Sequence, residues 1–199
     1  VMLEYEDDNF VDVVGAGVNS IRTRWQHERA QSVLRRVSGG IGVSPHIMSS
    51  FPEGIPKMLL RGVVSDDVLN AARAGSASKR NIIAFSGTLA DSKGIVQLIE
   101  AWKCRPVDGW ELHIAGDGVL GPVVRKMSEG VPRIVLRGLL NRQLNAAFLA
   151  EARIGINPHA LSSTPGNVFA FKIIEYLAAG THVITTPMGP LEAELERGI

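Results

Sequence analysis

The chain has 199 residues, of which 45% are apolar, and its 21 basic and 20 acidic side chains nearly balance. Without a polybasic run, this charge balance argues against a nucleic-acid partner. The single cysteine, Cys104, excludes a disulfide within the chain and any metal site built from several cysteines. No apolar run approaches the roughly 18 residues that a membrane span needs, so the composition favours a globular protein of one large domain or parts of two.

The first 80 residues follow a less regular pattern than the rest. The chain begins at Val1 without an initiator Met or a signal-like segment and ends at Ile199, and we expect it to be a fragment of a longer protein. The small, polar stretch 71–79 (AARAGSASK) is typical of a linker, and we place a domain boundary near Gly75. Before this boundary we expect strands at 1–3, 11–14, 41–43 and 58–64, a long polar helix at 20–38 and a helical turn at 45–51.

From residue 81 onward, apolar β-branched runs alternate with segments of helical period. Strands separated by single helices predict βαβ units and a parallel sheet. The sequence therefore predicts an α/β fold: a Rossmann-like parallel sheet flanked by helices over 76–199, after a partial α/β domain over 1–75. The expected strands are 82–85, 112–115, 134–136, 154–156 and 183–185, and the expected helices are 94–103, 120–128, 143–152 and 169–179.

The segment 11–20 (VDVVGAGVNS) combines a strand with two glycines and so suggests a dinucleotide site. Gly15 and Gly17 fit the first two glycines of a GxGxxG fingerprint, but Ser20 stands at the third. The next expected strand, 41–43, is not followed by the acidic residue that holds the ribose of a nicotinamide cofactor. A plain turn is favoured here, and a nicotinamide-dependent oxidoreductase stays as the minor alternative.

Several other kinds of site are weakly supported or excluded. The segment 3–8 (LEYEDD) carries Glu6 and Asp8, which could hold a divalent cation or act as a base, although a solvated strand end is favoured. The five histidines lack metal-ligand spacing, and we expect His113 and His182, within or beside strands, to be packing residues. The sequence lacks a GxSxG nucleophile motif and a Walker A motif, which excludes hydrolases of that kind and P-loop enzymes.

Three turn regions of the second half carry residues suited to a phosphorylated ligand. In 85–94 (FSGTLADSKG), Lys93 lies where a helix begins after a glycine turn and could neutralise a phosphate. The segment 114–118 (IAGDG) is a strand that ends in another glycine turn, at the sheet edge where open α/β folds bind ligands. In 164–180 (TPGNVFAFKIIEYLAAG), Glu175 lies among apolar helix residues, where a carboxylate is costly unless it has a partner.

In their order along the chain, these segments resemble the nucleotide-sugar half of a GT-B glycosyltransferase of the large retaining family called family 4 (glycosyl transferases group 1). The resemblance covers about residues 77–199 and rests on SGTLADSKG, IAGDG, IVLRGLL, ARIGINP and NVFAFKIIEYLAAGTHVITTPMGP. The preceding VSPHIMSSF and IPKMLLRGVV look like the end of the N-terminal, acceptor-side domain and the crossing to the next. The resemblance thus implies a donor-binding domain, truncated at its C-terminus, after a remnant of the acceptor-side domain.

The resemblance also implies which residues hold the donor. Lys93 would contact the diphosphate and Glu175 the ribose, and these two are the candidates for the catalytic site. The family's basic residue after the glycine turn is Thr88 here, and its first glutamate, eight positions before the second, is Asn167, so this chain departs from the family at both positions. The other implied donor contacts are Gly87 and Gly116, Gly138 with Leu139 beside the base, and the amides of Phe169, Ala170 and Phe171 beside the diphosphate.

The implied activity is transfer of a sugar, with retention, from a UDP, GDP or ADP sugar to a glycan or lipid-linked acceptor, as in the synthesis of polysaccharides, glycolipids and other glycoconjugates. The resemblance implies no cofactor and no metal ion, and a cytoplasmic enzyme for which peripheral association with the inner face of the membrane stays open. Lys93 and a helix N-terminus would supply the positive charge that a departing diphosphate needs. A nucleotide-binding module without activity of its own is the main alternative, because the acceptor-side domain is incomplete.

Overall fold

The computed structural model describes residues 2–5, 28–29, 32–75, 79–159 and 170–187. The chain divides into two compact units. The first comprises Val1–Val63 with Ser162–Phe169 and Pro187–Ile199, and the second comprises Val64–Leu161 with Ala170–Thr186. The division falls before the segment 64–75, which the sequence analysis placed in the first domain.

The first unit is built on a three-stranded parallel sheet in the order β1, β2, β3. The expected strands at 1–3 and 41–43 and the helical turn at 45–51 are confirmed, whereas the strand at 58–64 is wrong beyond Leu59 because the chain leaves the sheet after Leu60 N donates to Gly42 O at 3.0 Å. The expected strand at 11–14 and most of the helix at 20–38 lie outside the described residues. The elements are β1 (Met2–Tyr5), β2 (Gly39–Gly42), α3 (Pro45–Ser50) and β3 (Lys57–Leu59).

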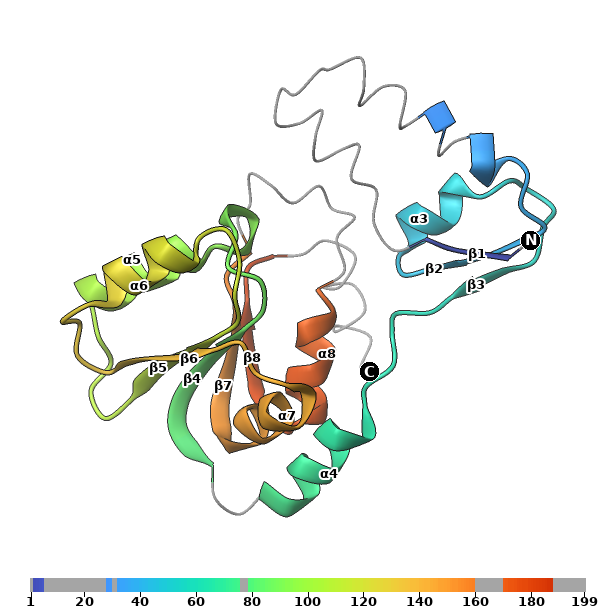
Figure 1. Ribbon diagram of the computed structural model, residues 1–199. Helices are drawn as coiled ribbons and strands as arrows, with labels where there is room; N and C mark the ends of the chain where they lie inside the picture. Colours follow the sequence, from blue (N-terminus) through green and yellow to red (C-terminus); the bar gives the residue numbers. More distant parts are fainter. Residues whose placement is uncertain (1, 6–27, 30–31, 76–78, 160–169, 188–199) are drawn as a thin grey trace. The chain divides into compact units, whose positions relative to one another are not determined.

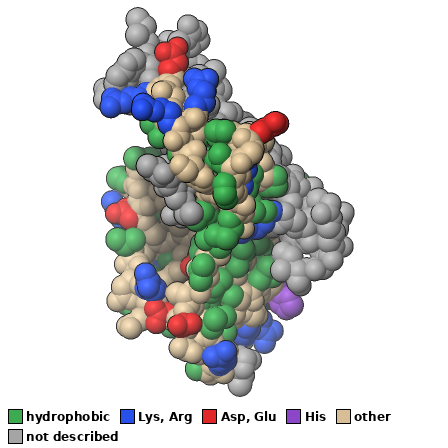
Figure 2. Space-filling view, turned by 90° about the vertical axis from the view of Figure 1, so that its right-hand side faces the viewer, with side chains coloured by type: hydrophobic (Ala, Val, Ile, Leu, Met, Phe, Trp, Pro, Cys, Tyr) green, Lys and Arg blue, Asp and Glu red, His purple; other side chains and the backbone are tan. Residues whose placement is uncertain are grey.

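A small hydrophobic core fixes helix α3 on this sheet. Leu34, Val37, Ile47 and Phe51 are buried together, and Gly40 of β2 has no Cβ where the Phe51 ring lies against it. The three residues of β3, in contrast, are all exposed. Figure 2 shows exposed hydrophobic side chains beside charged ones on one face of the molecule.

The second unit contains a five-stranded parallel sheet in the order β6-β5-β4-β7-β8. The chain starts in the middle, adds two strands on one side and then two on the other, so the strand order reverses between β4 and β7. In such doubly wound sheets the ligand crevice lies at the carboxyl ends of the strands beside this reversal. All five expected strands are confirmed: β4 (Arg80–Ser86), β5 (Glu111–Ala115), β6 (Ile134–Gly138), β7 (Ala152–Asn157) and β8 (His182–Thr185).

Helices cover both faces of this sheet, with α5 and α6 on one face and α4, α7 and α8 on the other (Figure 1). The alternation of side chains along β4 explains the two cores. Ile82 and Ala84 pack with α4, α7 and α8, whereas Ile83 and Phe85 pack with α5 and α6. The helices are α4 (Asp66–Gly75), α5 (Ile95–Cys104), α6 (Gly121–Ser128), α7 (Arg142–Glu151) and α8 (Phe171–Ala178), with a 3-10 turn η1 (Asp91–Lys93) before α5.

The linker expected at 71–79 is wrong in its first part, because residues 66–75 form helix α4. Its composition is small and polar, yet Val68 is buried in the same core as α7 and α8, and α4 packs mainly on α7. Tertiary packing here overrides a weak local preference. After α4, the ammonium group of Lys79 donates to the carbonyl oxygens of Ala150, Ala152 and Ala179 at 3.0–3.1 Å. Lys79 thus binds the C-terminal ends of α7 and α8 together.

Candidate functional site

Two glycine turns meet at the carboxyl edge of the second sheet. The turn after β4 and the turn after β5 are joined by hydrogen bonds from Gly87 N to Ala115 O at 3.0 Å and from Leu89 N to Asp117 O at 2.9 Å. Gly116 has a φ of 137°, and a Cβ on it would collide with the carbonyl oxygen of Gly87. Only glycine allows the two turns to approach so closely.

These turns border two neighbouring hollows. One has a volume of 370 Å³ and is lined by the turns after β4, β5 and β6 and by α7 and α8. The other, of 340 Å³, lies toward α6. Both are lined by Gly116, Asp117 and Leu139, and the Leu139 side chain is 79% exposed. The larger hollow brings together Gly87, Thr88, Gly116, Leu139, Asn145 and Glu175, and the smaller one includes Gly138.

Helix α8 supplies the acidic side of the larger hollow. Burial raises the pKa of Glu175, and the nearby Lys172 acts in the opposite direction. Ala170 is the N-cap residue and Phe171 the first residue of α8, so both lie at the helix end where backbone amides lack intrahelical partners. Asn167 and Phe169, the other donor contacts expected here, lie outside the described residues.

Tyr176 fixes α8 against the first glycine turn. Its hydroxyl oxygen accepts a hydrogen bond from Ser86 N at 2.9 Å, and Ser86 Oγ donates to Asn145 Oδ1 at 2.7 Å. The buried ring lies directly over Gly155 of β7, where any Cβ would collide with it. Tyr176 therefore holds the end of β4, and with it Gly87, in a defined position relative to Glu175.

Two lysines from different elements lie close enough to interact electrostatically, and we call Lys93 and Lys172 the lysine pair. Lys93, from η1, lies 3.2 Å from Nε2 of the buried His159 through its Nζ atom, and it lines neither of the two hollows. Lys172, in the first turn of α8, has its Nζ atom 4.5 Å from the centroid of the Phe85 ring. Burial and the charge of Lys93 together lower the pKa of Lys172 to about 8, against the opposing effect of Glu175.

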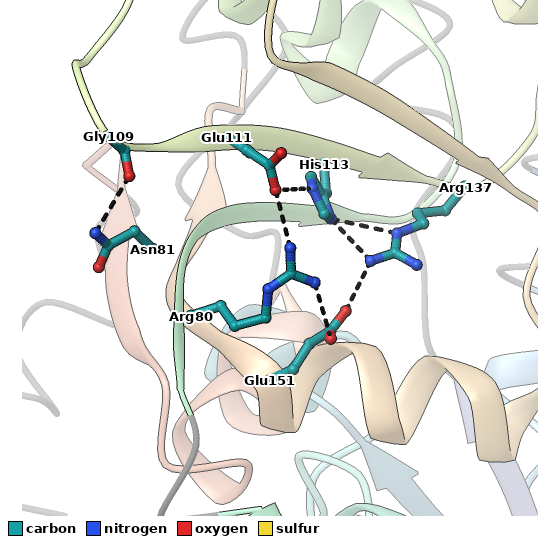
Figure 3. A network of polar contacts seen from close by, with 7 residues as sticks. All are labelled: Arg80, Asn81, Gly109, Glu111, His113, Arg137 and Glu151. Carbon is teal, nitrogen blue, oxygen red and sulfur yellow. Dashed lines mark hydrogen bonds and ion pairs between the residues drawn. The ribbon is translucent and has the colours of Figure 1, made fainter.

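A second polar cluster lies between β4, β5, β6 and α7, and Figure 3 shows its members. We call Arg80, Glu111, His113, Arg137 and Glu151 the His113 network. The His113 ring is 2% exposed. Its Nδ1 accepts from Arg137 at 3.0 Å and its Nε2 lies 3.0 Å from Glu111 Oε2, which fixes the neutral tautomer with the proton on Nε2. His113 is therefore a packing residue, as expected from the sequence, and lines neither hollow.

Glu151 and Arg80 close the His113 network into a ring. Arg137 donates to Glu151 Oε1 at 2.8 Å, and Arg80 lies 3.2 Å from Glu111 Oε2 and 3.6 Å from Glu151 Oε2. Arg137 also lies over the Phe148 ring, 5.6 Å from its centroid. Each charged group of the network thus has a partner of opposite sign or an aromatic ring.

The described ranges contain neither a metal-binding cluster nor a membrane-spanning helix. There, no three His, Cys, Asp or Glu side chains gather in a way that could hold a metal ion. In the same part of the chain, no helix has the length and apolarity to cross a membrane. Glu6 and Asp8, the carboxylates considered from the sequence, lie outside it.

Several residues of the site were not foreseen from the sequence, including Arg142 and Asn145 in the larger hollow, Lys172 and His159. Lys172 was missed because a lysine three positions before a glutamate on a helix is typical of an exposed ion pair. Its flanking apolar residues in FKII were the available signal. His159 was missed because nothing in the sequence places it beside Lys93, 66 residues away.

Comparison with known proteins gives a family match and many structural matches. Residues 80–198 match the family described as glycosyl transferases group 1. No curated protein matches the sequence significantly. Among solved structures, sucrose-phosphate synthase from Thermosynechococcus elongatus has a TM-score of 0.67 at 19% identity, covering 96% of this chain and 51% of that one.

Two further structures have the same arrangement. WaaG, a glycosyltransferase involved in lipopolysaccharide biosynthesis, has a TM-score of 0.66 at 12% identity, covering 98% of this chain and 59% of its own. HepE from Anabaena, solved with UDP and glucose, has a TM-score of 0.64 at 14% identity, covering 96% of this chain and 54% of its own. The Rossmann-like α/β fold is therefore confirmed, and the chain spans little more than half the length of these proteins.

Proposed function

The chain belongs to the family of glycosyl transferases group 1, and from this membership we propose that its second unit binds the nucleotide-sugar donor of a glycosyltransferase. The observation that carries the proposal is the larger hollow at the sheet edge, where two glycine turns face Glu175. A hollow beside the strand-order reversal is where doubly wound sheets bind nucleotides.

Each part of the donor has a suitable partner in the proposed site. Glu175 accepts hydrogen bonds from the ribose hydroxyls, and the exposed Leu139, beside Gly138, borders the base. The diphosphate lies at the glycine turn near Lys93 and the first amides of α8. In the reaction the bond between the sugar and the diphosphate breaks, so the positive charge there stabilises the leaving group as its negative charge develops.

The finer features of the reaction are part of the proposal. The transfer retains configuration, the donor carries UDP, GDP or ADP, and no metal ion takes part. The acceptor is a glycan or a lipid-linked glycoconjugate, and the protein is cytoplasmic, with peripheral contact to the membrane where the acceptor is a lipid. HepE, a structural match, was solved with UDP and glucose, which makes UDP the first nucleotide to test.

A binding module without activity is the second candidate. This candidate is favoured because the chain matches only part of the length of the solved structures, 51% of sucrose-phosphate synthase and 59% of WaaG. In this case the second unit binds the donor while the acceptor and the base come from residues outside this chain.

Ligand binding and turnover separate these candidates. We expect one of UDP, GDP and ADP to raise the melting temperature of the chain, whereas NAD has no effect. No response to any of the three together with stabilisation by NAD would contradict the proposal in favour of the nicotinamide-dependent alternative. Hydrolysis or transfer of the matching nucleotide sugar by this chain then distinguishes an enzyme from a binding module.

A further inference from the structure

Lys172 occupies an unusual position for a lysine. Its Nζ atom is buried and lacks a hydrogen-bond partner within the part of the chain that the structure describes. It lies 2.9 Å from the point where a Cβ of Gly87 would stand, so the ammonium group faces the first glycine turn directly. The Phe85 ring below it offers only a cation–π contact. Three N–H groups therefore remain available for a ligand at this turn.

The surroundings of Lys172 disfavour its charged form in the free protein. Lys93 repels it, and burial disfavours its charged form. Glu175, one turn further along α8, attracts it but makes no ion pair with it among the described contacts. Repulsion between two neighbouring ammonium groups is relieved when an anion binds to both of them.

We infer that Lys172 is a second cation for the donor diphosphate, beside Lys93, an inference that rests on the proposed function. Its ammonium group donates to phosphate oxygens at the Gly87 turn and holds the leaving diphosphate. Lys93 belongs to η1, which precedes α5, and Lys172 belongs to α8. Because α5 and α8 flank opposite faces of the sheet, the two cations come from opposite sides of it. Such charge-assisted hydrogen bonds to phosphate are among the strong ones.

Calorimetric titration of the chain tests this inference with the nucleoside diphosphate that stabilises it and with the corresponding nucleoside. We expect Lys172→Met to weaken the diphosphate about 10- to 100-fold and to change the affinity for the nucleoside less than about twofold. Lys172→Arg, which keeps a cation, is expected to recover part of the loss. Lys103→Met, at an exposed lysine near the end of α5, is the matched control and is expected to bind like the wild type.

Proton uptake gives a readout that does not depend on a folded variant. Because the pKa of Lys172 is about 8 in the free protein, most of these side chains are neutral at pH 9, and an anion recharges them. Titrations in two buffers of different ionisation enthalpy should show uptake of roughly 0.5–1 proton per diphosphate bound at pH 9, and much less with the nucleoside.

The outcomes separate the inference from the function on which it rests. If the wild type binds a nucleoside diphosphate without proton uptake, or if Lys172→Met binds it as tightly as the wild type, the inference is overturned and the donor site stands. Equal losses for the diphosphate and the nucleoside also overturn it, since they indicate a structural role. If the wild type binds none of UDP, GDP and ADP, both the inference and the proposed function fail.

Discussion

The His113 network and the lysine pair are both partly buried polar clusters of the second unit, but they differ in how completely their groups are paired. In the network, Arg137 donates to both His113 and Glu151, and Glu111 contacts both His113 and Arg80. In the lysine pair, the Lys172 ammonium group has no hydrogen-bond partner within the described residues. Because the groups of the network satisfy one another, we expect the network to stabilise the fold, whereas the unpaired Lys172 ammonium group is available to a ligand.

The largest effect is expected at the acidic side of the site. Glu175→Ala removes the proposed acceptor of two ribose hydrogen bonds to a charged group, so we expect nucleotide affinity to fall about 100- to 1,000-fold. Calorimetric titration with the stabilising nucleotide measures it, and Glu100→Ala, at an exposed position of α5, is the control. Unchanged affinity would show that the ribose does not lie at Glu175.

The lysine pair should affect the stability of the folded chain as well as nucleotide binding. Folding lowers the pKa of Lys172 from 10.5 to about 8, so its charge destabilises the folded chain below pH 8 by up to about 3 kcal/mol. Between pH 8 and 10.5 the lysine of the unfolded chain still holds its proton, whereas that of the folded chain has released it. The destabilisation caused by Lys172 therefore decreases as the pH rises, and the free energy of unfolding increases. We therefore expect Lys172→Met to be more stable than the wild type at pH 7.

Urea unfolding at pH 7 and pH 10 measures this difference. The gain of Lys172→Met over the wild type should shrink at pH 10, and Lys103→Met should show neither the gain nor its pH dependence. A variant less stable than the wild type at pH 7 would mean that Lys172 serves the fold, as the His113 network does.

A substitution in the His113 network should have the opposite effects to Lys172→Met. It should lower the stability of the fold and leave nucleotide affinity unchanged. Arg137→Met leaves His113 Nδ1 without its partner and Glu151 with only its 3.6 Å contact to Arg80. Because Arg137 and Glu151 are both about one-third exposed, we expect the free energy of unfolding to fall by about 1–2 kcal/mol. Urea unfolding gives the loss, and nucleotide titration should give an affinity within about twofold of the wild type. Arg105→Met, at an exposed arginine after α5, is the control, and weaker nucleotide binding would show that the network supports the site.

The smallest effect is expected from the titration of His113. Burial, with the charge of Arg137, lowers its pKa despite the opposing effect of Glu111, so the unfolded imidazole takes up a proton at a higher pH than the folded one. Stability from this residue is complete above the unfolded pKa of about 6.5 and is lost as the pH falls below it. The wild type should thus lose more stability than His113→Gln between pH 7.5 and pH 5 in urea unfolding. Equal losses of stability in the wild type and in His113→Gln would indicate that other groups determine how stability falls at acidic pH.

The part of the fold that follows local pattern could be predicted from the sequence, and the part that depends on distant contacts could not. The five strands after residue 81 are recognisable because each is a continuous apolar run between turns. Helix α4 was missed because AARAG carries little apolar periodicity, and the helix is held by its packing on α7 and α8. Gly87 and Glu175 were proposed as donor contacts through the family resemblance, but the approach of Lys172 to Gly87, 85 positions away, depends on the folded sheet.

The ammonium group of Lys79 has a mechanical consequence for the two helices that border the site. It clamps the carbonyl ends of α7 and α8 through Ala150, Ala152 and Ala179, and these ends point away from the glycine turns. Asn145 and Lys172 lie nearer the opposite ends of α7 and α8. Lys79 therefore anchors the two helix ends that lie away from the proposed donor site, while Tyr176 ties α8 to the end of β4.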